Sequence, residues 1–504
     1  MSRLFAVLLG LSALVASASA GIALTGDAVF TSTRSITCLA IAPDGTLWVG
    51  TSGGVLRRSK DSEWRRFTQL DGLPSHEVRS IAVEQGAVVA TFPRASATWR
   101  DGRWVPGEVP PAARADTMPQ QTCAAVWRSE PSVATVDGLY IGYANNRRRF
   151  DLPPSTGTHL SALLPHGEEL WAAMFDQGLW AFNGKTWRAL NLGLPSQARE
   201  ITALTADGQT LWLGTRREGV WQYDRRRWKQ HLQPNEPYAH NCQALIYWRS
   251  GIYVSTLEDG LVAQTPSGWQ HYAVPVLSSN APGQMVAFGG SLYLRHGNGK
   301  VDRFDGKRWT RNVCSSLPRK EVRALAADGN RLYAAQWGGW SEFDGHTWKH
   351  HLSIAELQGV AITILSPERD RLWIGTQGRG LGEFDRATGR LRWHDERQGL
   401  PDDWVTGIAR AGDTLCVATF LGGLSRWDGA RWEVSAELRD QNLTAIAPDG
   451  AGGLFIATRE GVWHQTRDSS LRRLVADVEG QALCLAPGGL WIGSRTELHF
   501  LAKP

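Results

Sequence analysis

Long hydrophobic runs and charge of one sign are scarce in this 504-residue sequence, and each shortage excludes a class of protein. After the first twenty residues, no run approaches the roughly 18 apolar residues of a membrane-spanning helix. The formal net charge is +5. Over this length that balance is too weak to indicate nucleic acid or an anionic membrane surface as a partner. We therefore expect no membrane span and no nucleic-acid partner.

Local catalytic and metal-binding motifs are also missing. The sequence has no Gly-x-Ser-x-Gly nucleophile elbow and no phosphate-binding loop. The histidines of "GHTWKHH" (345–351) lack metal-ligand spacing. We expect no catalytic residue, metal or cofactor. An enzyme whose catalytic residues are scattered over loops remains an alternative, because such residues leave no local motif.

The one long apolar run lies at the N-terminus. Residues 1–20 combine Arg3, an apolar stretch from Leu4 to Val15 and a small-residue Ala-Ser-Ala before Gly21. These are the three parts of a secretory signal peptide. We predict cleavage near Ala20 and a mature chain in the periplasm or outside the cell.

Tryptophan, glycine and repetition are abundant. The chain holds 24 Trp and 54 Gly, and many recur in one pattern, seen in "LWVGTSGG" from Leu47, "LWLGTRREGV" from Leu211 and "LWIGTQGRGL" from Leu372. Twelve copies begin near Trp48, Val88, Ser132, Trp171, Trp212, Tyr253, Tyr293, Tyr333, Trp373, Cys416, Phe455 and Trp491. Their mean spacing of about 40 residues is the period of a propeller blade. The sequence predicts an all-β protein, a β-propeller of twelve four-stranded blades.

The fifth copy shows how one repeat makes a blade. Strand-like runs at 201–207 and 210–215 are separated by an Asp-Gly turn, and "VWQYD" and "RRRW" follow. Other copies have Asx-Gly in the last turn, which suits a tight hairpin. Arg225, Arg226 and Arg227 therefore occupy an exposed turn tip, with a binding patch as the alternative. The recurrent Trp residues are expected to pack sheet against sheet.

The two ends of the chain are complementary. The last copy, "LWIGSRTELHFLAKP", stops before its closing Trp strand, and the N-terminal "GIALTGDAVFTSTRS" lacks an opening strand. An unpaired sheet edge is a liability. We predict that residues 28–33 form the outer strand of the last blade.

A single ring of twelve blades would leave a wide channel, so we expect two propellers of about six blades each. The loop-like segment "AVPVLSSNAPGQ" (273–284) suggests a first propeller over 21–276 and a second over 277–504. Seven plus five blades, or one ring, are the alternatives. The predicted closure also implies that one half is inserted in the other.

The six cysteines fit the repeat better than a disulfide framework. Cys38, Cys123 and Cys484 fall where other copies have a small first-strand residue, and Cys416 falls at the Trp212 position. Buried thiols that act as small hydrophobes explain these positions.

With "DGLP" at 71–74, "LGLP" at 192–195 and "QGLP" at 398–401, the "LWxGT" copies resemble the two-component regulator propeller repeat. That family occurs in periplasmic sensor regions of hybrid histidine kinases, where paired propellers sense glycan fragments. Family receptors continue into an immunoglobulin-like domain, a membrane span and a kinase, and this sequence contains none of them. The resemblance implies the sensing or docking half, which would act with a separate signalling partner.

Candidate ligand residues lie where the repeat rule fails, because local rules tend to break at functional sites. The Thr215 position is Thr or Ser in nine copies, but Met174, His296 and Gln336 occupy the other three. Trp337 follows in a loop. We hypothesise that His296, Gln336 and Trp337 line a propeller mouth and bind a sugar ring, with drift of a degenerate repeat as the alternative. Further candidates on the same loop face are Met174, Phe175, Arg216, Arg217, Arg379 and Phe420.

The sequence thus predicts an exported, non-catalytic binding or sensor-like propeller that recognises glycan or a cell-surface protein. A polysaccharide-active or lyase-type propeller enzyme and an envelope assembly scaffold are the two alternatives.

Overall fold

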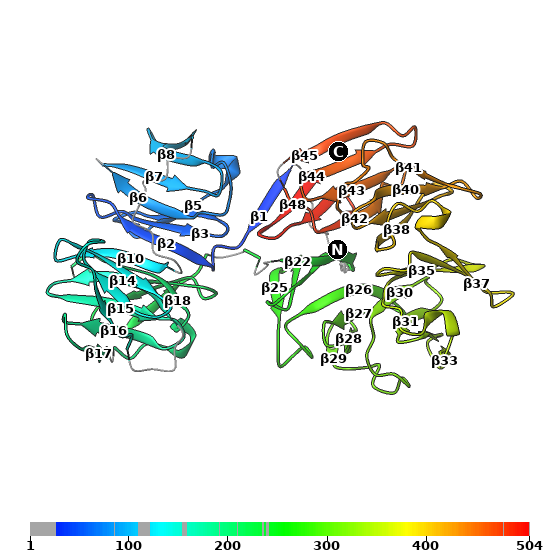
Figure 1. Cartoon of the computed structure of the whole chain (residues 1–504), viewed down its shortest axis with the longest axis horizontal. Helices are drawn as coiled ribbons and strands as arrows, with labels where there is room; N and C mark the ends of the chain where they lie inside the picture. Colours follow the sequence, from blue (N-terminus) through cyan, green and yellow to red (C-terminus); the bar gives the residue numbers. More distant parts are fainter. Residues whose placement is uncertain are drawn as a thin grey trace, which may run out of the picture.

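Strand pairing divides the chain into twelve antiparallel sheets of four strands, which confirms the predicted propeller fold (Figure 1). The computed structural model describes residues 27–84, 86–108, 121–153, 159–190, 192–208, 210–233, 236–237, 241–476 and 478–502. The predicted signal peptide and its cleavage site near Ala20 lie outside the described residues. Within the described part, no helix is long and apolar enough to span a membrane.

Five sheets come from strands that are consecutive in the first half of the chain. They are β2 (Ile36–Ile41), β3 (Leu47–Thr51), β4 (Gly54–Arg58) and β5 (Trp64–Phe67); β6 (Ser80–Glu84), β7 (Ala87–Thr91), β8 (Ser96–Arg100) and β9 (Arg103–Gly107); β10 (Gln121–Trp127), β11 (Glu130–Thr135), β12 (Leu139–Ile141) and β13 (Arg148–Phe150); β14 (Leu160–His166), β15 (Glu169–Met174), β16 (Gly178–Phe182) and β17 (Trp187–Ala189); and β18 (Ile201–Ala206), β19 (Leu211–Thr215), β20 (Val220–Tyr223) and β21 (Trp228–His231).

Six further sheets are also consecutive. They are β22 (Cys242–Trp248), β23 (Gly251–Thr256), β24 (Leu261–Thr265) and β25 (Gly268–Tyr272); β26 (Pro282–Phe288), β27 (Ser291–His296), β28 (Val301–Phe304) and β29 (Trp309–Thr310); β30 (Ala324–Ala327), β31 (Leu332–Gln336), β32 (Gly339–Phe343) and β33 (Trp348–His351); β34 (Ile362–Pro367), β35 (Arg371–Thr376), β36 (Leu381–Asp385) and β37 (Leu391–His394); β38 (Val405–Ala411), β39 (Thr414–Thr419), β40 (Gly423–Trp427) and β41 (Trp432–Val434); and β42 (Leu443–Pro448), β43 (Leu454–Thr458), β44 (Gly461–Gln465) and β45 (Leu471–Ala476).

The twelfth sheet joins the two ends of the chain. Its order is β1 (Ala28–Thr31), β48 (Glu497–Ala502), β47 (Gly489–Gly493) and β46 (Ala482–Ala486). Strand β1 runs antiparallel to β48, with Val29 opposite His499. This is the closure that the sequence predicts. Short 3-10 helices occur between sheets at η1 (Gln69–Asp71), η2 (Ser196–Ala198), η3 (Ala355–Leu357) and η4 (Glu396–Gln398).

Contacts between first strands group the sheets as five and seven. In the five-bladed lobe, which comprises β2 to β21, β2 packs on β6 and on β18, and β14 packs on β10 and β18. In the seven-bladed ring, which comprises β22 to β48 with β1, each first strand packs on the next and β46 returns to β22. Figure 1 shows these as two separate lobes. The boundary expected at 276/277 therefore differs from the contacts, because β22 to β25 pack with the later sheets.

The five-bladed lobe is an insertion in the seven-bladed ring. The chain leaves the ring after β1, builds the lobe and returns before β22. The two crossing segments are tied together, since the backbone N and Oγ1 of Thr33 donate to Oε2 of the buried Glu236 at 3.0 Å and 2.7 Å. The lobe and the ring thus share a fixed, hydrogen-bonded crossing point.

The "LWxGT" pattern matches how adjacent sheets approach. A Cβ at Gly214 would overlap the side chain of Ile36 in the neighbouring sheet, and one at Gly493 would overlap Cys242. A bulge in the first strand turns a hydroxyl towards the next sheet. Thr202, for example, donates through Oγ1 to the carbonyl of Ile36 at 2.7 Å. Glycine and threonine in the repeat therefore serve sheet-to-sheet contact.

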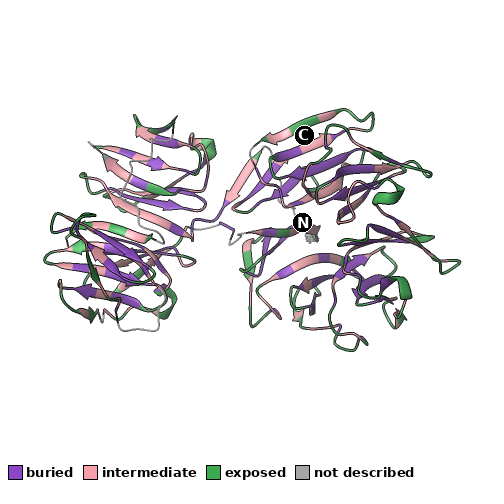
Figure 2. Ribbon diagram, in the orientation of Figure 1, coloured by how far each residue is buried: buried purple, intermediate pink, exposed green. Residues whose placement is uncertain are grey.

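The core lies between the sheets, where Figure 2 shows most of the buried strand surface. Trp212 and Trp373 are buried there, as the repeat predicts. All six cysteines are free. Burial raises the pKa of the Cys38 thiol to about 11 and that of Cys314 to about 12. Cys242, Cys314 and Cys416 are buried and the other three are half-buried, and none is in a disulfide, as the repeat predicts.

Candidate functional site

One mouth of the seven-bladed ring is formed by turns between second and third strands and by the loops that enter each next sheet. In two successive sheets, β34 to β37 and β38 to β41, these turns are held by backbone hydrogen bonds to the segment that enters β38. The backbone N of Gly378 and that of Gly380 donate to the carbonyl of Asp403 at 3.0 Å and 2.8 Å, and the N of Phe420 donates to that of Trp404 at 2.9 Å. The side chains on these turns are therefore presented from a rigid frame.

Trp337, on the turn between β31 and β32, is the exposed aromatic residue that the sequence predicts at this mouth. Its side chain is 37% exposed. The guanidinium of Arg323 lies 4.2 Å from its ring centroid, and Nη1 of Arg319 donates to its carbonyl. A Trp held in this way offers a stacking plane with cationic donors beside it.

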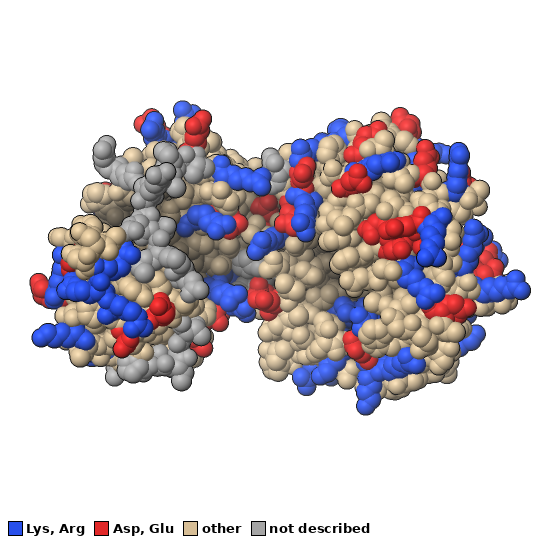
Figure 3. Space-filling view, in the orientation of Figure 1, with Lys and Arg blue, Asp and Glu red and all other residues tan. Residues whose placement is uncertain are grey.

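Charge around Trp337 is mixed. Arg323 pairs with Glu321 at 3.2 Å. Burial, and secondarily the charge of Arg323, lower the pKa of the neighbouring Arg295, whose Nε donates to the carbonyl of Val322 at 3.1 Å. In the view of Figure 3, basic and acidic side chains are likewise interspersed. The mouth therefore presents both donors and acceptors, as the hydroxyls of a sugar require.

Arg379 and Phe420 occupy equivalent turns on the next two sheets. Nη1 of Arg379 donates to the carbonyl of Glu356 at 2.8 Å, and its guanidinium lies 4.7 Å from the ring of Trp393. Phe420 stacks on Trp404 with ring centroids 4.3 Å apart. These two candidates lie on the same face of the ring as Trp337.

His296 and Gln336 are not at the mouth surface, in contrast to the expectation. Both side chains are fully buried. Nε2 of His296 pairs with Oδ2 of Asp302 at 2.8 Å, and Oε1 of Gln336 accepts from Oγ of Ser341 at 2.5 Å. Each side chain therefore forms a hydrogen bond to the third strand of its own sheet and is not exposed at the mouth.

The remaining candidates lie in the five-bladed lobe, so the predicted residues do not form one site. Met174 is fully buried in a hydrophobic cluster, and Phe175 stacks on His159 with centroids 5.5 Å apart. Arg216 and Arg217 reach the seven-bladed ring and pair with Glu258 at 3.6 Å and 3.2 Å. They border a cavity of about 160 Å³ at the junction, and their ion pairs link the two lobes.

Sequence reasoning missed Arg323 and Trp404. Arg323 stands where other copies have the first-strand threonine of Thr202, Thr363 and Thr406, and Trp404 lies at neither recurrent Trp position of the repeat. Both departures were visible in the alignment of copies. Over the described ranges, no group of three or more His, Cys, Asp or Glu side chains is placed to hold a metal ion.

Comparison with known proteins supports the fold. Residues 31–53 match the family model "Two component regulator propeller", which confirms the resemblance seen in the sequence. Among solved structures, the chain is similar to the GH74 enzyme of Niastella koreensis, with 14% identity, a TM-score of 0.52 and coverage of 93% of this chain and 82% of that one.

The chain is also similar to the extracellular domains of two hybrid two component systems of B. thetaiotaomicron. For BT3049 the identity is 16% and the TM-score 0.46, over 93% of this chain and 68% of that one. For BT4673 the values are 14% and 0.45, over 93% and 70%. No curated protein sequence matches the chain. At 14% identity, the likeness to the GH74 enzyme concerns the fold alone.

Proposed function

We propose that the chain is an exported, sensor-like binding propeller that recognises glycan at the mouth of the seven-bladed ring. The observation that carries the proposal is Trp337, an exposed indole on a hydrogen-bonded turn with Arg323 against it. A sugar has an apolar C–H face and a rim of hydroxyls. The indole suits the face, and Arg323 and Glu321 suit the rim.

The repeat family and the N-terminal sequence support the cellular setting of this proposal. The matched repeat is that of two component regulators, and residues 1–20 have the composition of a signal peptide. We infer cleavage near Ala20, a location in the periplasm or outside the cell, and a separate signalling partner that reads the bound state.

A glycan array probed with residues 21–504 tests the proposal, followed by calorimetry on the strongest hit. We expect Trp337→Ala to weaken binding about tenfold, which corresponds to about 1.4 kcal/mol. This is within reach of a lost aromatic stack. The melting temperature should change little, because Trp337 is on a surface turn. Tyr143→Ala is the matched control, since Tyr143 is 59% exposed in the five-bladed lobe.

Three outcomes would contradict the proposal. A lower melting temperature for Trp337→Ala with unchanged affinity would make Trp337 a packing residue. Equal loss of affinity in the Tyr143 control would place the glycan elsewhere. Turnover of the bound glycan would make the chain an enzyme, and an array without any hit would remove glycan as the ligand.

A further inference from the structure

One tryptophan departs from the burial pattern of the repeat. At the Trp212 position the side chain is buried in eleven of the twelve copies, and Trp171 is the exception. Trp212 is covered by the guanidinium of Arg58, 5.0 Å from its ring. Trp171 has the ring of His166 beside it instead, with centroids 4.1 Å apart. It is packed only in part against the cluster around Leu211, and it borders an open space.

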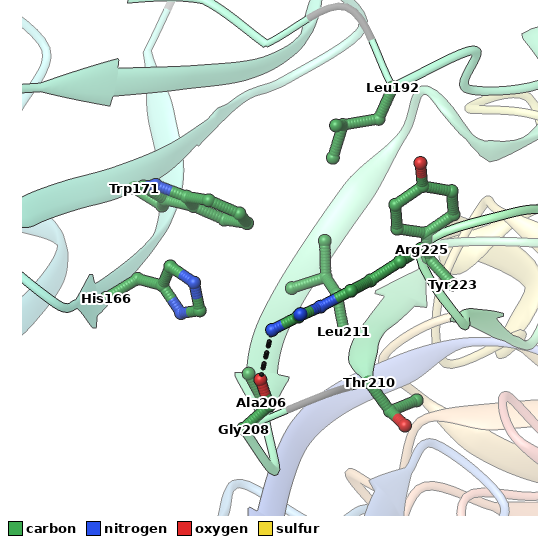
Figure 4. A pocket seen from close by; sticks show the side chains of 9 residues that line it. All are labelled: His166, Trp171, Leu192, Ala206, Gly208, Thr210, Leu211, Tyr223 and Arg225. Atoms are coloured by element: carbon green, nitrogen blue, oxygen red, sulfur yellow. Dashed lines mark hydrogen bonds between the residues drawn. The ribbon is translucent and has the colours of Figure 1, made fainter.

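That space is a cavity of about 230 Å³ between the sheets β14 to β17 and β18 to β21. In Figure 4, Trp171 and His166 lie on one side of it, and Leu211, Tyr223 and Arg225 lie on the other. The volume is below the roughly 300–1,000 Å³ of pockets for drug-sized ligands. It suits a single ring with a short substituent. The remaining lining residues are Leu192, Ala206, Gly208 and Thr210.

The backbone of Arg225 is strained. Its φ is 67°, in the left-handed region that side chains with a Cβ rarely adopt. The same turn carries glycine at φ 99–103° in four other sheets, at Gly184, Gly306, Gly345 and Gly429. Arg225 therefore keeps the positive φ of its turn but places there a residue with a side chain, where those four sheets have glycine.

The side chain of Arg225 reaches the cavity. Nη2 of Arg225 donates to the carbonyl of Gly208 at 2.9 Å, which fixes the guanidinium at the rim of the cavity. Among the described residues Arg225 forms no ion pair, whereas Arg227 lies 3.8 Å from Asp224 in the same turn. The cavity thus has one guanidinium without a carboxylate partner.

Carboxylates on the neighbouring strands are already engaged. Glu169 accepts from Nη2 of Arg188 at 3.0 Å with both oxygens and from Nε1 of Trp171 at 3.3 Å. Asp207 accepts from the backbone N of Thr210 at 3.1 Å. An anionic group in the cavity would therefore meet the guanidinium of Arg225 as its main charged partner.

We propose that this cavity binds a single-ring aromatic carboxylate, with the ring between Trp171 and Tyr223 and the carboxylate on Arg225. The aliphatic walls at Leu192 and Leu211 favour an aromatic ring over a sugar, whose many hydroxyls would find few partners. A guanidinium binds a carboxylate by charge-assisted hydrogen bonds. The site is independent of the mouth at Trp337, which lies in the other lobe.

Calorimetric titration of residues 21–504 with benzoate, and with benzamide as its neutral counterpart, tests the inference. We expect benzoate to bind at least tenfold more tightly than benzamide. Arg225→Gly should reduce benzoate affinity to that of benzamide without lowering the melting temperature, because glycine is the residue that this turn favours. Trp171→Phe should weaken both ligands.

Arg226→Ala is the matched control. It removes the same charge one residue away, and Arg226 does not line the cavity, so benzoate affinity should stay within about twofold on the scale of a surface substitution. Trp337→Ala should also leave benzoate binding unchanged, which separates this site from the glycan mouth.

Each opposite result overturns the inference. If titration with benzoate gives no heat of binding, aromatic carboxylates are excluded as ligands of this cavity. Equal affinity in Arg225→Gly and Arg226→Ala moves the anion away from Arg225. Tighter binding of glucuronate than of benzoate, lost in Arg225→Gly, replaces the aromatic ring by a sugar acid.

Discussion

Replacing Phe30 with alanine should destabilise the seven-bladed ring and spare the five-bladed lobe, although the next strand along the chain belongs to the lobe. Phe30 lies edge-on to Trp269 and stacked on Trp491, with centroids 5.5 Å away in each case. A fully buried Phe→Ala change costs about 3–5 kcal/mol. Phe30 is half-buried, so we take about 2 kcal/mol, and add about 1 kcal/mol for the lost aromatic pairs.

A loss of about 3 kcal/mol corresponds to about 6–12 °C in the melting temperature of a unit of this size. Differential scanning calorimetry measures the shift, and hydrogen exchange read by mass spectrometry assigns each transition to its strands. The matched control is Phe150→Ala. Phe150 is half-buried in β13 and lies 5.0 Å from Phe182, so this change should lower the transition of the five-bladed lobe.

The reasoning fails if Phe30→Ala leaves the exchange of β46 to β48 at its wild-type level, since β1 would then not close that sheet. It also fails if Phe30→Ala and Phe150→Ala lower one common transition, since the two lobes would then not unfold as separate units.

Two further predictions concern buried ionisable groups. Burial raises the pKa of Glu497, but hydrogen bonds with His499 and His76 outweigh burial and hold it well below its ordinary 4.5. The stabilisation is therefore complete above about pH 4.5 and is lost as the pH falls below it. Urea unfolding of Glu497→Gln should show a loss of about 1–3 kcal/mol at pH 7 that narrows towards pH 3, and equal curves at pH 7 would contradict this. Cys242 and Cys314, whose pKa values burial raises, should resist iodoacetamide at pH 8 until the chain is unfolded. Mass spectrometry of native and urea-treated samples checks this, and rapid native labelling of either thiol would refute its burial.

Much of the fold could be predicted from the sequence, because the information is local. The 40-residue period fixes the number of sheets, and the missing strands at the two ends predict the pairing of β1 with β48. The division into five and seven could not be predicted, because it depends on contacts between distant copies. The repeats keep the same spacing where the chain passes from the ring to the lobe and back, so the spacing does not mark these points. The packing of β2 on β18 and of β22 on β46 shows which sheets are neighbours.

Of the three residues predicted to line one mouth, the structure exposes Trp337 and buries His296 and Gln336. Trp337 was found because a Trp in a loop breaks the repeat. The predicted exposure of His296 and Gln336 is wrong, because a residue that departs from the repeat can still point into its sheet. In the structure each is matched by a polar residue on the facing third strand, Asp302 for His296 and Ser341 for Gln336. Both partners can be read in the sequence, and each forms a hydrogen bond with the buried polar residue that faces it.

The insertion of one lobe into the other sets an order of assembly. All strands of the five-bladed lobe are complete once β21 has been made, whereas Val29 must wait for His499, 470 residues later in the chain. At about 5–20 residues per second, that wait is on the order of half a minute to a minute and a half. During this interval strand β1 has no partner, and the ring sheets made so far have unpaired edges. Unpaired edges can pair with the wrong strands. The inserted lobe separates these two edges along the chain, and strand β48, which pairs with both β1 and β47, is the one that removes them.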